Sequence, residues 1–226
     1  MTATLMRCLL SLFLMTLMAK PAFAQDKELA IWTAASSSFE LSERMYLDGA
    51  LAFRSNAGLN AISRYFGEAG VGYKLSNSFS GVAGVRYGTL LDRSGGVQGN
   101  FTFYRFFAEL KHKASWRQLR FKQRLRFQED TEKKQGTRTD NHLRYKTAVE
   151  FKIPNWKADP QVSVEFFKPL GSNSVNGFDR MRYKLQTDLS LAGNALTIAY
   201  FIDRDTPLNT AAINSHMLGL FYDLEF

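Results

Sequence analysis

Apolar residues occupy every second position in repeated stretches of about ten residues, and turn-forming residues separate these stretches. In the clearest stretch, LRFKQRLRFQ from Leu119 to Gln128, leucine and phenylalanine stand opposite a row of arginine and lysine. Such alternation is typical of a β-strand whose two faces meet different surroundings. We therefore expect an all-β protein whose strands each have one apolar face and one polar, often basic, face.

Ten strands are predicted from residue 44 to the end of the chain. They cover approximately 44–53, 64–75, 79–87, 102–110, 119–127, 143–153, 162–166, 180–191, 196–202 and 212–226. Short turns are expected near residues 42, 77, 114 and 193, and longer polar loops at 55–62, 88–99, 129–139, 169–177 and 204–211. The 154–160 connection is the exception, because it is long for a turn. Short connections at one end and long ones at the other are typical of bacterial outer-membrane barrels.

These features favour a transmembrane antiparallel up-and-down β-barrel of 10 to 12 strands. A soluble β-sandwich also alternates, but four basic residues in a row on one strand face suit a barrel lumen better than a water-facing sheet. The stretch Leu29–Leu41 is an eleventh candidate strand. It breaks the even strand number expected of such barrels, so it either has an undetected partner, which gives twelve strands, or lies inside or beside a ten-stranded barrel.

The N-terminal residues have the pattern of an export signal. A basic residue, Arg7, precedes the apolar run Cys8–Ala19, and Ala22–Ala24 provides a small-x-small cleavage site before Gln25. The apolar run is too short to span a membrane as a helix. We expect residues 1–24 to be a cleaved signal peptide and residues 25–226 to form an outer-membrane barrel.

Charge and cysteine content narrow the possibilities further. The chain has 29 basic and 21 acidic residues, and removal of the signal peptide would leave a net charge of about +6. Its one cysteine, Cys8, lies within the expected signal peptide. An exported chain without cysteine has no disulfide scaffold, no thiolate metal site and no cysteine nucleophile.

The C-terminal stretch LGLFYDLEF resembles the signal by which the barrel assembly machinery recognises outer-membrane proteins. The matching residues are Leu218, Leu220, Tyr222, Leu224 and Phe226. Almost the whole mature chain also resembles an uncharacterised family of Gram-negative outer-membrane barrels, the domain of unknown function 2490. This likeness is carried by Ile31–Thr33, Val71–Phe79, Arg120–Phe127, His142–Pro154 and Arg180–Leu191. It implies a fold and a place among outer-membrane lipid and lipopolysaccharide, and it implies no activity.

Three predicted strands carry basic residues on the face opposite the apolar one, and these would form a basic wall inside the lumen. They are Arg120, Lys122, Arg124, Arg126, Arg144, Lys146, Arg180, Arg182 and Lys184. Such a wall predicts a small pore, or a solute-binding barrel, that favours anionic solutes such as acidic oligosaccharides. Alternatively the lumen is plugged and these cations pair with Glu109, Glu150, Glu165 and Asp188.

Other functions have less support from the residues. A lipid- or lipopolysaccharide-modifying enzyme would need a pair such as Ser215 with His142, made across strands, and we assign no catalytic residue. His112 and His216 suggest no site, no metal-ligand spacing is present, and no cofactor is expected. Nucleic-acid binding is disfavoured because the aromatic residues lie opposite the arginines rather than beside them. A structural accessory for surface-polymer export would leave no sequence trace.

Overall fold

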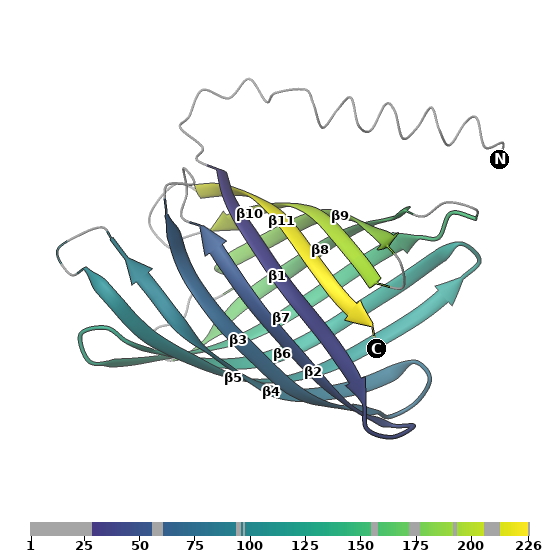
Figure 1. Ribbon diagram of the computed structural model, residues 1–226, viewed down its shortest axis with the longest axis horizontal. Helices are drawn as coiled ribbons and strands as arrows, with labels where there is room; N and C mark the ends of the chain where they lie inside the picture. The colour runs from purple at the N-terminus through teal and green to yellow at the C-terminus, as the bar shows by residue number, and fades with distance from the viewer. Residues whose placement is uncertain are drawn as a thin grey trace.

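The computed structural model describes residues 29–55, 61–93, 96, 98–154, 158–171, 177–191, 194–205 and 213–225. The expected signal peptide and the terminal Phe226 lie outside these ranges. Within them the chain forms eleven β-strands that close into one barrel (Figure 1). The strands are β1 (Leu29–Glu40), β2 (Met45–Ser55), β3 (Ile62–Lys74), β4 (Phe79–Asp92), β5 (Gly99–Trp116), β6 (Leu119–Lys133), β7 (Thr137–Phe151), β8 (Ala158–Leu170), β9 (Arg180–Leu191), β10 (Asn194–Asp205) and β11 (Ile213–Glu225). Among the described residues, no helix is long and apolar enough to cross a membrane.

The barrel closes through a parallel pairing of its first and last strands. β1 pairs with β11 in parallel, with Leu29 beside His216 and Ser38 beside Glu225, and it pairs with β2 in the antiparallel sense. All the other neighbours in the barrel are antiparallel. In a meander with an odd number of strands the first and last strands run the same way, so closure requires one parallel pair. The up-and-down β-barrel is confirmed, but its wholly antiparallel character is corrected, and residues 29–40 are a wall strand of an eleven-stranded barrel.

Several predicted loops are shorter in the structure than in the sequence interpretation. The β6 and β7 ladder continues to the pair Lys133 and Thr137, so the expected loop at 129–139 is mostly strand. β8 is also longer than expected and contains Pro160, one residue beyond the end of its ladder with β7. Pro160 is paired with Thr187 in the ladder with β9, so proline stands where the strand has a partner on one side only.

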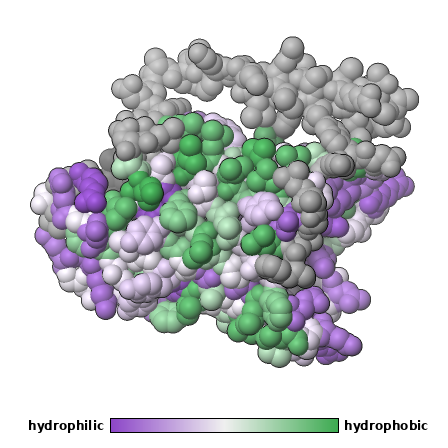
Figure 2. All heavy atoms as spheres, in the orientation of Figure 1, coloured by the Kyte–Doolittle hydropathy of each residue, from purple (hydrophilic) through white to green (hydrophobic). Residues whose placement is uncertain are grey.

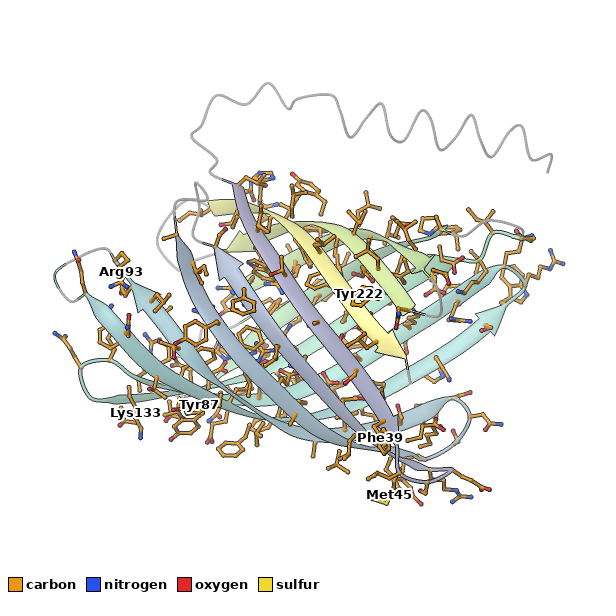
Figure 3. All side chains as sticks on the ribbon, viewed as in Figure 1. Phe39, Met45, Tyr87, Arg93, Lys133 and Tyr222 are labelled. Atoms are coloured by element: carbon orange, nitrogen blue, oxygen red, sulfur yellow. The ribbon has the colours of Figure 1, made fainter. Side chains whose placement is uncertain are left out.

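The outer surface of the barrel is apolar over the middle of the strands. Leu51, Phe53, Val85, Tyr87 and Leu220 are all 46–65% exposed there. Figure 2 shows apolar residues over the middle of the visible face and hydrophilic residues toward its left and right ends. In Figure 3, Arg93 and Lys133 lie at one end of the barrel, and Phe39 and Met45 lie at the other. We call these the long-loop end and the short-turn end.

Inward-facing glycines make room for aromatic side chains in the lumen. A Cβ atom on Gly84 would lie 2.5 Å from the Phe107 ring, and one on Gly219 would lie 2.6 Å from the Phe201 ring. A Cβ on Gly72 would overlap the ring of Tyr46. These glycines therefore allow large rings from neighbouring strands to lie flat against the inner wall, where any side chain would collide with them.

Candidate functional site: a basic cavity in the lumen

The lumen is divided along its length into a filled part and an open part. Toward the long-loop end, arginines and aromatic rings interdigitate; we call this set the arginine–aromatic layer. It consists of Trp32, Arg54, Phe66, Arg86, Phe103, Phe107, Arg126, Arg144, Phe167, Arg182 and Phe201. Toward the short-turn end lies a cavity of about 1560 Å³, which we call the turn-end cavity.

The arginine–aromatic layer is densely packed. Phe66, Phe103, Phe107, Phe167 and Phe201 are only 4–7% exposed although they point into the lumen. The guanidinium groups lie over the rings at short distances. The carbon-to-centroid distances are 3.9 Å for Arg54 over Trp32, 3.9 Å for Arg86 over Phe66, 4.2 Å for Arg126 over Phe107 and 4.4 Å for Arg144 over Phe167. Each such contact is favourable by about 0.5–2 kcal/mol. Buried rings and guanidinium groups therefore occupy the lumen at this level.

The turn-end cavity opens among the short turns. Its mouth is lined by Glu43, Arg44, Asn77 and Ser115, which lie in or beside the connections between consecutive strands. Its deeper wall is formed by inward side chains of β1 and of β6 to β11. This wall includes Lys122, Arg124, Lys146, Gln161, Lys184 and Phe221.

The structure divides the nine basic wall residues among three environments. All nine lie on the lumen-facing side of their strands. Arg120, Lys122, Arg124, Lys146 and Lys184 line the turn-end cavity. Arg126, Arg144 and Arg182 belong to the arginine–aromatic layer. Arg180 pairs with Asp205 near the long-loop end, 2.5 Å away, so it contributes nothing to the cavity.

Most of these cations are neutralised by buried carboxylates. Glu165 accepts from Arg124 at 2.5 Å and from Arg144 at 2.8 Å. Glu109, which is 7% exposed, pairs with Arg126 and lies 3.2 Å from Arg124. Glu109 and Glu165 therefore pair with basic wall residues, as expected in the alternative interpretation in which acidic side chains neutralise those cations.

Glu150 and Asp188, the other two acidic residues of the predicted set, have different kinds of partner. Glu150 is 1% exposed and pairs with Arg120 at 3.1 Å and with Lys122. Just beyond β7, Lys152 also contacts Glu150, and its hydrogen bond to Asp159 raises the pKa of Lys152. Asp188 instead accepts hydrogen bonds from Gln186 and Thr197.

Two lysines on the cavity wall make no short contact with a carboxylate of the described residues, although Lys146 is the register partner of Glu165 on β8. Among the described residues, no ion pair forms with the ammonium group of Lys146 or of Lys184. Lys184 lies 5.0 Å from the Phe201 ring centroid and 5.1 Å from that of Phe221. Beside them Gln161, 3% exposed, presents an Oε1 atom that accepts no hydrogen bond from the described residues. This wall therefore carries two ammonium groups that no ion pair neutralises among the described residues, and a buried acceptor, Gln161 Oε1, without a donor among them.

The adjoining wall, formed by β1, β2 and β11, carries a smaller number of acidic and hydroxyl groups. Ser36 on β1 donates a hydrogen bond to Asp223 on β11, and Ser38 donates to Asp48 on β2 at 2.8 Å. Both carboxylates line a second cavity of about 510 Å³, which adjoins the first and is also lined by Arg124. We call Ser36, Ser38, Asp48 and Asp223 the acidic wall.

Within the described part of the chain, no histidine is placed beside a serine in the arrangement of a hydrolytic site. His142 lies 3.9 Å from Asp130 and 3.9 Å from Asp179, near the long-loop end. Ser215 is on β11, and β8, β9 and β10 separate that strand from β7. His216 faces outward, where its Nδ1 atom and the Tyr200 hydroxyl are 2.5 Å apart. Among the described residues, no group of three or more histidine, cysteine, aspartate and glutamate side chains is placed to hold a metal ion.

The acidic wall and the arginine–aromatic layer were missed by the sequence interpretation. A signal for the layer was present, because Phe107 and Phe201 stand at positions whose strand neighbours two residues away are polar or small. The acidic wall had no comparable signal. Asp48 and Asp223 come together with Ser38 and Ser36 only through the closure of the barrel.

Comparison with known proteins gives one match. A family model described as a protein of unknown function, DUF2490, matches residues 29–205, which covers β1 to β10. Neither the curated proteins nor the solved structures searched contain a match.

Proposed function

The chain belongs to the DUF2490 family of proteins of unknown function, and we propose that it is an outer-membrane β-barrel that binds an anionic solute in its turn-end cavity. The observation that carries the proposal is the pair Lys146 and Lys184, two cations that form no ion pair among the described residues, on the wall of a cavity large enough for a small molecule. Unpaired like charges in a concave, partly desolvated site attract a ligand of opposite charge.

Binding is proposed in preference to open conduction because the arginine–aromatic layer occupies the lumen beyond the cavity. A solute entering from the short-turn end would meet side chains that are less than a tenth exposed. Short turns face the periplasm in bacterial outer-membrane barrels. The cavity would therefore take its solute from the periplasmic side.

The outer-membrane location rests on the apolar outer surface and on the expected signal peptide. Outward side chains such as Leu51, Phe53 and Val85 form an apolar band around strands of 11–18 residues. A transmembrane β-strand needs about 9–11 residues and has this outward pattern, so these strands are long enough to span a membrane. Outer-membrane lipid and lipopolysaccharide would contact this band, and the barrel assembly machinery would insert the protein.

Isothermal titration calorimetry of the folded barrel in neutral detergent tests the proposal. The probe is 4-hydroxybutyl phosphate, a small anion without a cationic group. We expect saturable binding by the wild-type protein, and at least tenfold weaker binding by the double variant Lys146→Gln, Lys184→Gln, because each lysine contributes an attraction that glutamine lacks.

The matched control removes the same charge from outside the cavity. Lys168 is exposed on β8, and Arg138 has a side chain 79% exposed on β7. Lys168→Gln, Arg138→Gln is expected to bind the probe as the wild type does. Equal weakening in both double variants would show a general charge effect, and no binding to the wild type would refute the proposal.

A further inference from the structure

We infer that the solute of the turn-end cavity is zwitterionic, with its anionic group against Lys146 and Lys184 and its cationic group against Asp223 and Asp48. The inference rests on the proposed function and specifies the chemical class of its ligand. It follows from the separation of unpaired charges of opposite sign onto two sides of one connected space.

The acidic wall, like the basic wall, carries charges that no ion pair neutralises among the described residues. Among the described residues, no cation forms an ion pair with Asp48 or Asp223. Each carboxylate accepts a hydrogen bond from one serine hydroxyl, while a carboxylate has about four acceptor positions. A neutral donor satisfies hydrogen bonding without neutralising the charge, so both groups remain able to attract a cation.

The two walls are near enough for one small molecule to contact both. Lys184 Nζ lies 5.1 Å from the centroid of the Phe221 ring, and Asp223 follows Phe221 by two residues on the same lumen face of β11. Two residues of a strand span roughly 6.8 Å. A ligand with its charged groups several bonds apart would therefore lie across Phe221 and contact an ammonium at one end and a carboxylate at the other.

Gln161 provides an independent indication of a ligand with donors as well as acceptors. Its buried Oε1 accepts no hydrogen bond from the described residues, and its cross-strand neighbours are Glu150 and Gln186. A simple inorganic anion is an acceptor and would leave this oxygen without a donor. An ammonium or hydroxyl group on the bound molecule would satisfy it.

The two cavities also share lining residues, so the acidic and basic walls belong to one connected site. Ser36, Ser38, Lys111, Arg124 and Asp223 line both. Arg124 is already held by Glu165 and Glu109. It therefore leaves the carboxylate of Asp223 available to a cationic group of the ligand.

The experiment compares two probes of equal length that differ in one group. 4-Aminobutyl phosphate carries an ammonium, and 4-hydroxybutyl phosphate carries a neutral hydroxyl at the same place. By calorimetry we expect the wild-type barrel to bind the amino compound at least tenfold more tightly. This comparison uses the wild-type protein alone, so it does not depend on the folding of any variant.

Variants then locate the preference. In Asp48→Asn, Asp223→Asn the serine hydrogen bonds are retained and both charges are lost, so the two probes are expected to bind about equally. Asp92→Asn, Asp140→Asn removes two charges at the long-loop end, where Asp92 pairs with Lys134 and Asp140 pairs with Arg138. This control is expected to keep the wild-type preference.

The outcomes separate the two proposals. If the wild type binds both probes equally, or binds the hydroxyl compound more tightly, the zwitterion inference is overturned while anion binding stands. If neither probe binds, the proposed function fails and the inference fails with it. A preference that survives in Asp48→Asn, Asp223→Asn would also overturn the inference, because the acidic wall would not be its source.

Discussion

Glu165 on β8 accepts a hydrogen bond of 2.5 Å from Arg124 on β6, so this ion pair reaches across the whole width of the intervening strand β7. The same carboxylate holds Arg144 on β7. One buried acidic side chain therefore ties three consecutive strands together on the lumen side. Removing the negative charge of Glu165 would leave the guanidinium groups of Arg124 and Arg144 close together without that carboxylate between them.

Glu165→Gln is expected to lower the free energy of unfolding by about 3–5 kcal/mol, the cost of leaving buried partner charges uncompensated. The measurement is equilibrium urea unfolding of the barrel in lipid vesicles, followed by tryptophan fluorescence. Glu40→Gln is the control, because Glu40 pairs with Lys74 at an exposed site and such pairs contribute about 0–1 kcal/mol. Similar losses in both variants would contradict the bridging role of Glu165.

Two glycines on one strand provide a second matched test. In Gly84→Ala the new Cβ would lie 2.5 Å from the Ala69 carbonyl oxygen and from the Phe107 ring, so the neighbours must shift. Overpacking of this kind costs about 1–3 kcal/mol. In Gly81→Ala the nearest atom is 3.8 Å away, an ordinary contact. We expect urea unfolding to show a loss only for Gly84→Ala, and an equal loss at Gly81 would mean that strand flexibility matters instead.

Period-two alternation was sufficient to predict the strands and their inward and outward faces. Leu125 and Phe127 are 43% and 45% exposed on the outer surface, whereas Arg126 is 6% exposed within the lumen. Alternation records only which side of a strand is apolar. It does not record which strands are neighbours at closure, so the parallel partner of residues 29–40 could not be found from it.

The candidate site was only partly accessible to sequence reasoning, for the same physical reason. The row of cations on β6 was visible, but whether each cation is neutralised depends on contacts across strands. Lys146 and Arg144 have the same face and similar neighbours in sequence. Lys146 is the register partner of Glu165, but Glu165 accepts hydrogen bonds from Arg144 and from Arg124 on β6 instead. The signal peptide and the assembly role of Phe226 stay predictions.

The parallel closure can be tested by disulfide cross-linking across β1 and β11. Ala35 and Tyr222 are partners in the register, and the only native cysteine, Cys8, lies in the expected signal peptide. Ala35→Cys, Tyr222→Cys should oxidise to a cross-linked barrel with altered gel mobility. In Ala35→Cys, Leu220→Cys the second cysteine stands beside Thr33 instead. That pair is offset by two residues and too far apart for a disulfide, so efficient cross-linking of it would refute this register.

The arginine–aromatic layer makes a prediction about conduction. In planar bilayers we expect the wild-type barrel to show no steady conductance, because buried rings and guanidinium groups fill the lumen at this level. The triple variant Phe107→Ala, Phe167→Ala, Phe201→Ala removes three of these rings while keeping Arg126, Arg144 and Arg182. It should conduct, and it should select anions because the remaining guanidinium groups repel cations.

The neighbouring residues in the chain provide the control for this variant. Phe106, Phe166 and Tyr200 each adjoin one of the three rings in sequence and lie on the opposite, outward face of the same strand. Replacing these three by alanine removes the same kind of side chain from the barrel without touching the lumen, so this variant should stay closed. Steady conductance in the wild type, or equal conductance in the two triple variants, would contradict the assignment of the layer as a plug. Cation selectivity in the inward variant would show instead that the glutamates, rather than the arginines, set the potential along the lumen.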